Sequence, residues 1–185
     1  MSRVSRGTPS GNAYLDLRNR AQRDGRPTQE LLQLYILEAF LGRLAASEAR
    51  SKFVLKGGVL LAAFDSRRPT RDVDLAGLDL ANDAEAVLGL VTSIVSAPPD
   101  VDDGVEFLPA TATAEVIREE DEYSGVRISM DARLGLRRTF HSTSTSMSAT
   151  RFGRRRARSR CRVSAAVSRS LSRAIRFTWS MPKRS

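Results

Sequence analysis

The stretch Phe53–Leu75 constrains the fold more than any other part of the chain. It begins with an apolar run, Phe53–Leu55, that predicts a buried strand ending at the diglycine Gly57-Gly58. A short apolar helix is expected over 59–64, and Pro69 then bends the chain before a second strand. This order of strand, diglycine, helix, turn and strand predicts a compact α/β unit.

Asp72 and Asp74 stand two residues apart in the second predicted strand, which places both carboxylates on one face and Val73 on the other. Neighbouring carboxylates need a counter-charge, and their hard oxygens are typical ligands of Mg²⁺, which commonly also binds substrate phosphates. The diglycine lets phosphate oxygens approach backbone N–H groups at the start of a helix. Together the two motifs indicate a site for a nucleotide and a divalent metal.

The residues Leu55-Lys56-Gly57-Gly58, the apolar helix and Arg68-x-Thr70-x-Asp72-x-Asp74-Leu75 resemble the AbiEii/AbiGii family of nucleotidyltransferase toxins, which includes the MenT group. The resemblance covers roughly residues 27 to 140. It implies the minimal fold of polymerase-β-like nucleotidyltransferases, an α/β (α+β) fold with a mixed sheet flanked by helices. It also implies Mg²⁺-dependent transfer of a nucleotide from an NTP to an RNA acceptor, the 3′ end of tRNA in the MenT group, and a cognate antitoxin protein as partner.

The resemblance assigns roles within this motif. Asp72 and Asp74 are the expected metal ligands and catalytic carboxylates. The expected nucleotide-binding residues are Gly57, Gly58, Thr70, Lys56 and Arg68. For Lys56, Arg68 and the neighbouring Arg71, a role as counter-charge for phosphate or RNA and a role as solvated surface are both open.

The remaining sequence divides the chain into three parts. Residues 1–26 are expected to be flexible with a short helix near 13–22, residues 27–140 form the core domain, and residues 141–185 are a basic tail. Periodicity predicts core helices from Thr28, as N-cap, through Leu44 and over 84–96, and strands over 105–108, 112–117 and 125–134. The acids of the 98–104 turn are expected to be solvated.

The charge is strongly divided between core and tail. Residues 141–185 carry 11 Arg and one Lys and no acid, which leaves 18 of the 30 basic residues against all 21 acids in the remainder, a formal −3. The overall +9 therefore describes the tail, which is expected to be disordered or poorly packed. The sequence has no long apolar run, no secretory signal and a single cysteine, Cys161. We therefore expect a cytoplasmic protein with no membrane contact.

The resemblance also implies a third carboxylate on the strand after the segment 125–140, where it would help to bind the metal that activates the attacking hydroxyl. That place holds the Ser/Thr-rich run 141–148, and no acid follows it in the chain. Asp131 precedes the expected strand, and the possibility that it replaces the third carboxylate stays open. The sequence therefore predicts a toxin whose activity is impaired by the loss of the third acid.

Two other functions are open. A non-enzymatic nucleic-acid-binding protein would act through the Arg-rich tail, with binding that falls steeply with salt and is lost when residues 141–185 are deleted. Within the enzyme class, the acceptor could be a small molecule such as an antibiotic.

The abrupt change at His141 also leads to a prediction about the coding DNA. Serine and threonine codons read from a displaced start can encode Asp-Val-Asn-Val, and Arg-rich, acid-free sequence is typical of the wrong frame in GC-rich DNA. If the tail is out of frame, another frame past codon 141 encodes an apolar, acid-bearing strand. Sequencing the DNA tests this, and the hypothesis fails if neither other frame contains such a strand.

Overall fold

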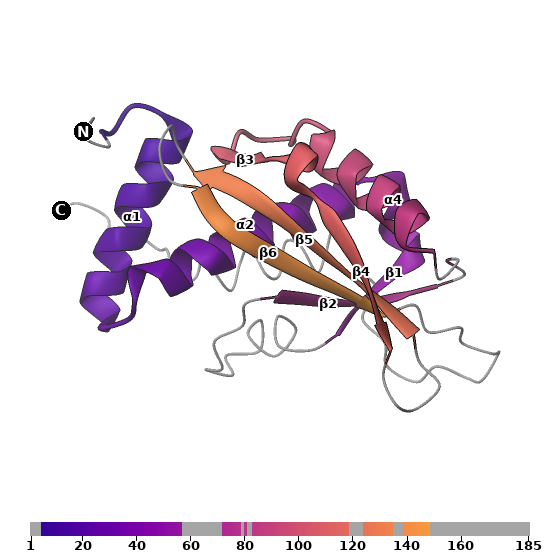
Figure 1. Ribbon diagram of the computed structural model, residues 1–185. Helices are drawn as coiled ribbons and strands as arrows, with labels where there is room; N and C mark the ends of the chain where they lie inside the picture. The colour runs from indigo at the N-terminus through magenta and orange to yellow at the C-terminus, as the bar shows by residue number, and fades with distance from the viewer. Residues whose placement is uncertain are drawn as a thin grey trace.

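The computed structural model describes residues 5–56, 72–78, 80, 83–118, 124–134 and 139–148. These residues form a mixed α+β fold, as the sequence predicts, with helices packed on a sheet (Figure 1). In chain order the elements are α1 (Pro9–Asp24), α2 (Thr28–Ala46), the 3-10 helix η1 (Glu48–Lys52), β1 (Phe53–Lys56), β2 (Asp72–Gly77), α4 (Ala84–Ser96), β3 (Val105–Phe107), the 3-10 helix η2 (Pro109–Thr111), β4 (Thr113–Arg118), β5 (Ser124–Leu134) and β6 (Thr139–Ser148).

The sheet has the strand order β1-β2-β6-β5-β3, and β4 pairs with the other half of the long strand β5. β2 and β6 are parallel, whereas the pairs β1–β2, β5–β6, β3–β5 and β4–β5 are antiparallel. Two strands that are more than 60 residues apart in sequence, β2 and β6, therefore lie side by side in the middle of the sheet (Figure 1). The predicted mixed sheet is confirmed.

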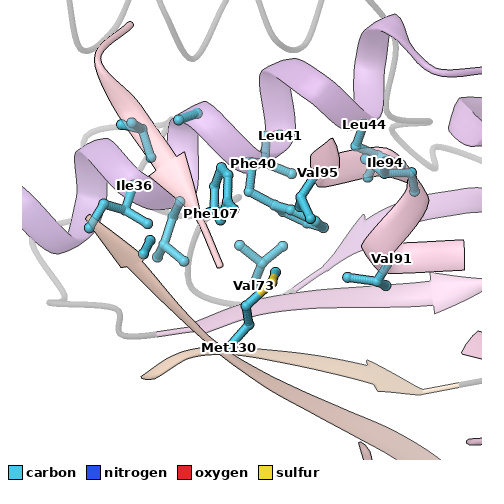
Figure 2. Close-up of a cluster of buried hydrophobic side chains, with 14 of the residues drawn as sticks. Ile36, Phe40, Leu41, Leu44, Val73, Val91, Ile94, Val95, Phe107 and Met130 are labelled. Atoms are coloured by element: carbon cyan, nitrogen blue, oxygen red, sulfur yellow. The ribbon is translucent and has the colours of Figure 1, made fainter. Parts of the chain in front are cut away.

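The hydrophobic core lies between one face of this sheet and helices α2 and α4. α2 packs on β6, and α4 packs on β4 and β5. The side chains between them come from both layers: Phe40, Leu44, Val91 and Ile94 from the helices, and Val73 and Met130 from the strands (Figure 2). Along β5 the buried Val126, Ile128 and Met130 alternate with Arg127, Ser129 and Asp131, as the period of two predicts.

Helix α1 is longer and better packed than the sequence predicts. It begins at Pro9 behind Thr8, whose hydroxyl accepts a hydrogen bond from the Gly11 N–H at 3.1 Å, and it ends at Gly25 in the left-handed conformation. Its buried side, which includes Ala13 and Leu17, belongs to the main core. The helix expected near 13–22 is therefore present, and it extends over residues 9–24 as an ordered part of the domain.

Helix α2 begins one residue earlier than predicted. Pro27 occupies the N-cap position in extended conformation, and Thr28 is the first helical residue, without a side-chain capping bond. Proline disfavours the helical conformation in the residue before it, Arg26, so the helix does not extend further back. The negative charge of Glu30 in the first turn interacts favourably with the positive end of the helix dipole. The prediction of Thr28 as N-cap is therefore wrong. The helix otherwise runs through Leu44 as expected.

Strand β6 corrects the predicted boundary of the tail. The basic tail was expected to begin at residue 141, but β6 continues to Ser148 between β2 and β5. The physical reason is that β2 and β5 would otherwise each present a row of unpaired backbone groups, and any extended segment can satisfy them regardless of its side chains. Residues 149–185 lie outside the described residues, so the prediction for them stays a prediction.

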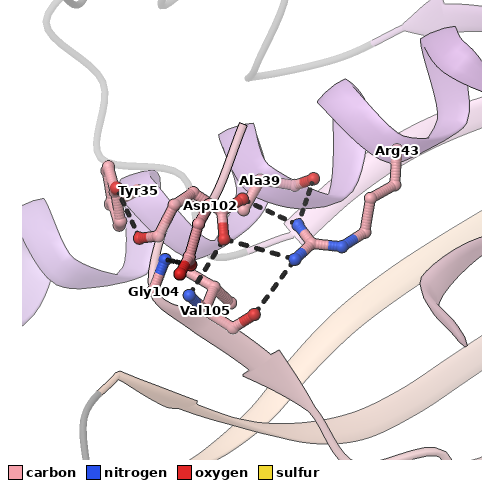
Figure 3. Close-up of polar contacts among 7 residues, drawn as sticks. Tyr35, Ala39, Arg43, Asp102, Gly104 and Val105 are labelled. Atoms are coloured by element: carbon pink, nitrogen blue, oxygen red, sulfur yellow. Dashed lines mark hydrogen bonds and ion pairs between the residues drawn. The ribbon is translucent and has the colours of Figure 1, made fainter. Parts of the chain in front are cut away.

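A buried ion pair fixes the 100–105 turn to α2. The guanidinium of Arg43, with only 4% of its side chain exposed, donates from Nη1 to Asp103 Oδ2 at 2.8 Å and from Nη2 to Oδ1 at 3.2 Å (Figure 3). It also donates to the carbonyls of Ala39 and Val105 and lies 4.9 Å from the ring centroid of Phe107. Asp103 was expected to be solvated, but its side chain is only 23% exposed and ion-paired.

Tyr35 adds a further contact to the same turn. Its hydroxyl donates to the backbone carbonyl of Asp103 at 2.8 Å. Burial first, and then the nearby acids led by Asp103, raise the pKa of the Tyr35 hydroxyl far above its ordinary value. The hydroxyl therefore remains a hydrogen-bond donor across the physiological pH range, and the turn is held to α2 through both its side chain and its backbone.

This arrangement predicts a large difference between two neighbouring aspartates. Asp103→Ala leaves the buried Arg43 guanidinium without its carboxylate and is expected to lower the free energy of unfolding by about 3 kcal/mol. Asp102→Ala removes only the bond from the Gly104 N–H, which is exposed, and is expected to cost about 1 kcal/mol or less. Urea unfolding of both variants measures the difference, and equal costs would contradict the proposed importance of the ion pair.

Candidate carboxylate site

Asp72 and Asp74 occupy the first half of β2, on the face of the strand that points away from the core. Both are partly exposed, whereas Val73 between them is fully buried in the core cluster together with Leu75. The apolar Val73 and Leu75 fix the strand's orientation, since a shift of one residue would bury the carboxylates instead. The prediction that the two carboxylates share one face of a strand, with Val73 on the other, is confirmed.

The pairing of five strands extends this face on both sides of β2. Asp72 lies beside Ser144 of β6, which in turn lies beside Ser129 of β5. The next row contains Asp74, followed by Ser146, Arg127 and finally Glu115 of β4. On the outer side of β2, Asp74 is paired with Lys56 of β1. The carboxylates thus belong to a polar band that crosses the sheet.

Strand β6 occupies the place where the third carboxylate is expected. It runs parallel to β2 and supplies Ser144 and Ser146 at the positions beside Asp72 and Asp74. The ten residues of β6 are Thr-Phe-His-Ser-Thr-Ser-Thr-Ser-Met-Ser, without an acid. The strand on which the third carboxylate is expected is therefore present in the fold, and it contains no acid.

Asp131 is not brought next to the pair. It lies on β5 at the register shift between Met130 and Ala132, two strands away from β2 and two residues beyond the row of Asp72. Ideal sheet spacings put its Cα roughly 12 Å from that of Asp72. Within the described ranges no group of three or more His, Cys, Asp or Glu residues could hold a metal ion. The strand register therefore does not support Asp131 as a replacement for the third carboxylate.

The remaining predicted site residues are described only in part. Lys56 is the last residue of β1, in register with Asp74. Gly57, Gly58, Arg68, Thr70 and Arg71 lie outside the described residues, so their roles stay predictions. The donors that are described, two carboxylates on one face, suit a hard divalent cation that takes its other ligands from water and phosphate oxygens.

The polar cluster of Tyr35, Arg43 and Asp103 was missed by sequence reasoning. One signal was available: Arg43 lies three and four residues after Phe40 and Ala39, on the buried side of an otherwise apolar helix. A charge at such a position requires a partner, although the sequence does not say which one. The cluster belongs to α2 and the turn before β3 rather than to the polar band, and its contacts are structural.

Comparison with known proteins identifies the family. The family model of the nucleotidyl transferase AbiEii toxin, from type IV toxin–antitoxin systems, matches residues 39–158. This range begins inside α2, includes all six strands and extends ten residues past β6. No curated protein matches the chain.

The helices in the described part of the chain lack the length and apolar character needed to cross a membrane. The family match covers more than half of the chain and includes the carboxylate pair with its neighbouring strands. The chain therefore belongs to the AbiEii family of nucleotidyltransferase toxins of type IV toxin–antitoxin systems.

Proposed function

We propose that this protein transfers a nucleotide from an NTP to the 3′ end of an RNA acceptor, tRNA or another RNA, in a Mg²⁺-dependent reaction. The observation that carries the proposal is the placement of Asp72 and Asp74 on one partly exposed face of β2, within the region matched by the nucleotidyltransferase family. The toxin would act in the cytoplasm, under the control of a cognate antitoxin protein.

The chemistry demands little of the protein besides positioning and charge neutralisation. Asp72 and Asp74 would hold the metal, which on binding supplies positive charge to the reacting phosphate. The predicted contacts of Gly57, Gly58 and Thr70 with the triphosphate would orient it toward this metal. The acceptor hydroxyl would then approach along the polar band, where β6 adjoins β2.

The serines of β6 suggest that the reaction is slow in this chain. A third carboxylate would normally help to bring the acceptor hydroxyl to the metal, and a neutral serine neither adds negative charge nor removes a proton at neutral pH. Binding of metal and triphosphate requires only the pair on β2. We therefore infer that binding is retained and that the transfer step is impaired.

Substitution of the pair tests the proposal directly. Asp72→Ala is expected to lower transfer of labelled nucleotide by on the order of a thousandfold, because the metal loses a ligand. The assay uses each labelled NTP in turn with Mg²⁺ and total tRNA. Glu106→Gln, which changes an exposed acid on β3, is the matched control. Transfer that persists in Asp72→Ala would refute the assignment, and binding that needs only residues 141–185 would favour the nucleic-acid-binding alternative.

Restoring an acid to β6 should increase activity. Ser144→Asp or Ser146→Asp places a carboxylate beside Asp72 or Asp74, and one of the two is expected to raise the transfer rate at least about tenfold. Ser148→Asp adds the same charge beside Ala76, where β2 offers no carboxylate, and should have no such effect. The rate is measured with saturating NTP and tRNA. An equal change in all three variants would show that added charge, not its place, matters.

A further inference from the structure

We propose that Arg127 of β5 is a phosphate-binding residue of the same site. The inference rests on the proposed function and extends it, since it adds to the site a cation from β5, a strand that lies outside the sequence motif. The phosphate belongs either to the bound NTP or to the backbone of the acceptor RNA. Both sources present the same chemistry to a guanidinium.

The register of three strands brings Arg127 to the row of Asp74. Asp74 pairs with Ser146 of β6, and Ser146 pairs with Arg127. Two strand spacings separate the Cα atoms of Asp74 and Arg127, roughly 10 Å. This is close enough for one phosphate to contact a metal at Asp74 and the long arginine side chain together.

Arg127 also lies on the correct face of the sheet. Its neighbours Val126 and Ile128 are buried in the core, in the rows of Leu75 and Val73, whereas Arg127 itself is exposed. The alternation of side chains along both strands therefore directs Arg127 and Asp74 away from the core together. A ligand above the polar band would meet both residues.

Among the described residues, the guanidinium of Arg127 has no hydrogen-bond or ion-pair partner, which leaves it available for a ligand. Glu115 of β4 is its cross-strand neighbour and the obvious rival partner, yet the structure forms no ion pair between these two residues. The contrast with Arg43 is clear, because that guanidinium has four hydrogen bonds and is buried. A planar guanidinium with free donors is well suited to bind two phosphate oxygens at once.

A second arginine on the same strand provides the matched control. Arg133 is also exposed and also alternates with buried residues, but it pairs with Glu106 of β3 and Thr139 of β6. Six residues separate it from Arg127, which corresponds to roughly 20 Å along β5. It has the same charge on the same face, beyond the reach of a ligand held at Asp74.

The experiment measures binding, so it does not depend on the rate of the transfer step. Equilibrium dialysis of the full chain uses each labelled NTP with Mg²⁺ in one arm and a short labelled single-stranded RNA in the other, at one fixed salt concentration. Arg127→Gln is expected to weaken binding in one or both arms roughly tenfold to a hundredfold, and Arg127→Lys to recover only part of it. Arg133→Gln should bind as the wild type does, and thermal melting confirms that both variants fold.

The two arms identify the source of the phosphate. Loss in the NTP arm assigns Arg127 to the triphosphate, and loss in the RNA arm assigns it to the acceptor. Equal binding by Arg127→Gln and wild type in both arms, equal losses in Arg127→Gln and Arg133→Gln, or no binding by the wild type would overturn the inference. If Asp72→Ala abolishes transfer while Arg127→Gln binds normally, only the inference about Arg127 fails; transfer that survives Asp72→Ala refutes the proposed function instead.

Discussion

The parallel pairing of β2 with β6 is the interaction on which the rest of this structure depends. β2 carries the carboxylates, and β5 contributes many of the buried side chains that the sheet adds to the core. Among the described strands, only β6 joins the two. Its ten residues come from the run where apolar periodicity has ended. Backbone hydrogen bonds do not depend on side-chain type, and threonine retains a good strand propensity. A central strand can therefore form from a sequence that contributes little apolar surface.

The sequence of β6 is unusual for a strand in the middle of a sheet. The positions of Thr143 and Thr145 are in register with Met130, Ile128 and Val73, which are all buried. Threonine has less apolar surface than valine or isoleucine, which are common in such strands. The same run lacks the acid that is expected beside Asp72 and Asp74, so one stretch of sequence accounts for both departures from the expected pattern.

Elements with a strong period were predictable, and those that depend on distant partners were not. The helix over 84–96 and the alternation of β5 follow from local apolar spacing and agree with the structure. α1 was underestimated because Ala13 and Ala21 give a weak apolar signal, although their small size allows close packing. The partnership of Asp103 with Arg43 spans 60 residues and has no local signature. The carboxylate pair itself was predictable, but its row neighbours require the strand order β2-β6-β5, which no local pattern encodes.

The packing of α1 has a consequence for how this domain can be divided. The family match starts at residue 39, inside α2, but the hydrophobic core does not start there. Ala13 and Leu17 of α1, and Leu32 and Ile36 of the first half of α2, belong to the same cluster as Phe53 and Val73. A fragment trimmed to the matched region would expose this apolar surface to water and invite aggregation. The smallest autonomous folding unit is thus larger than the segment by which the family is recognised.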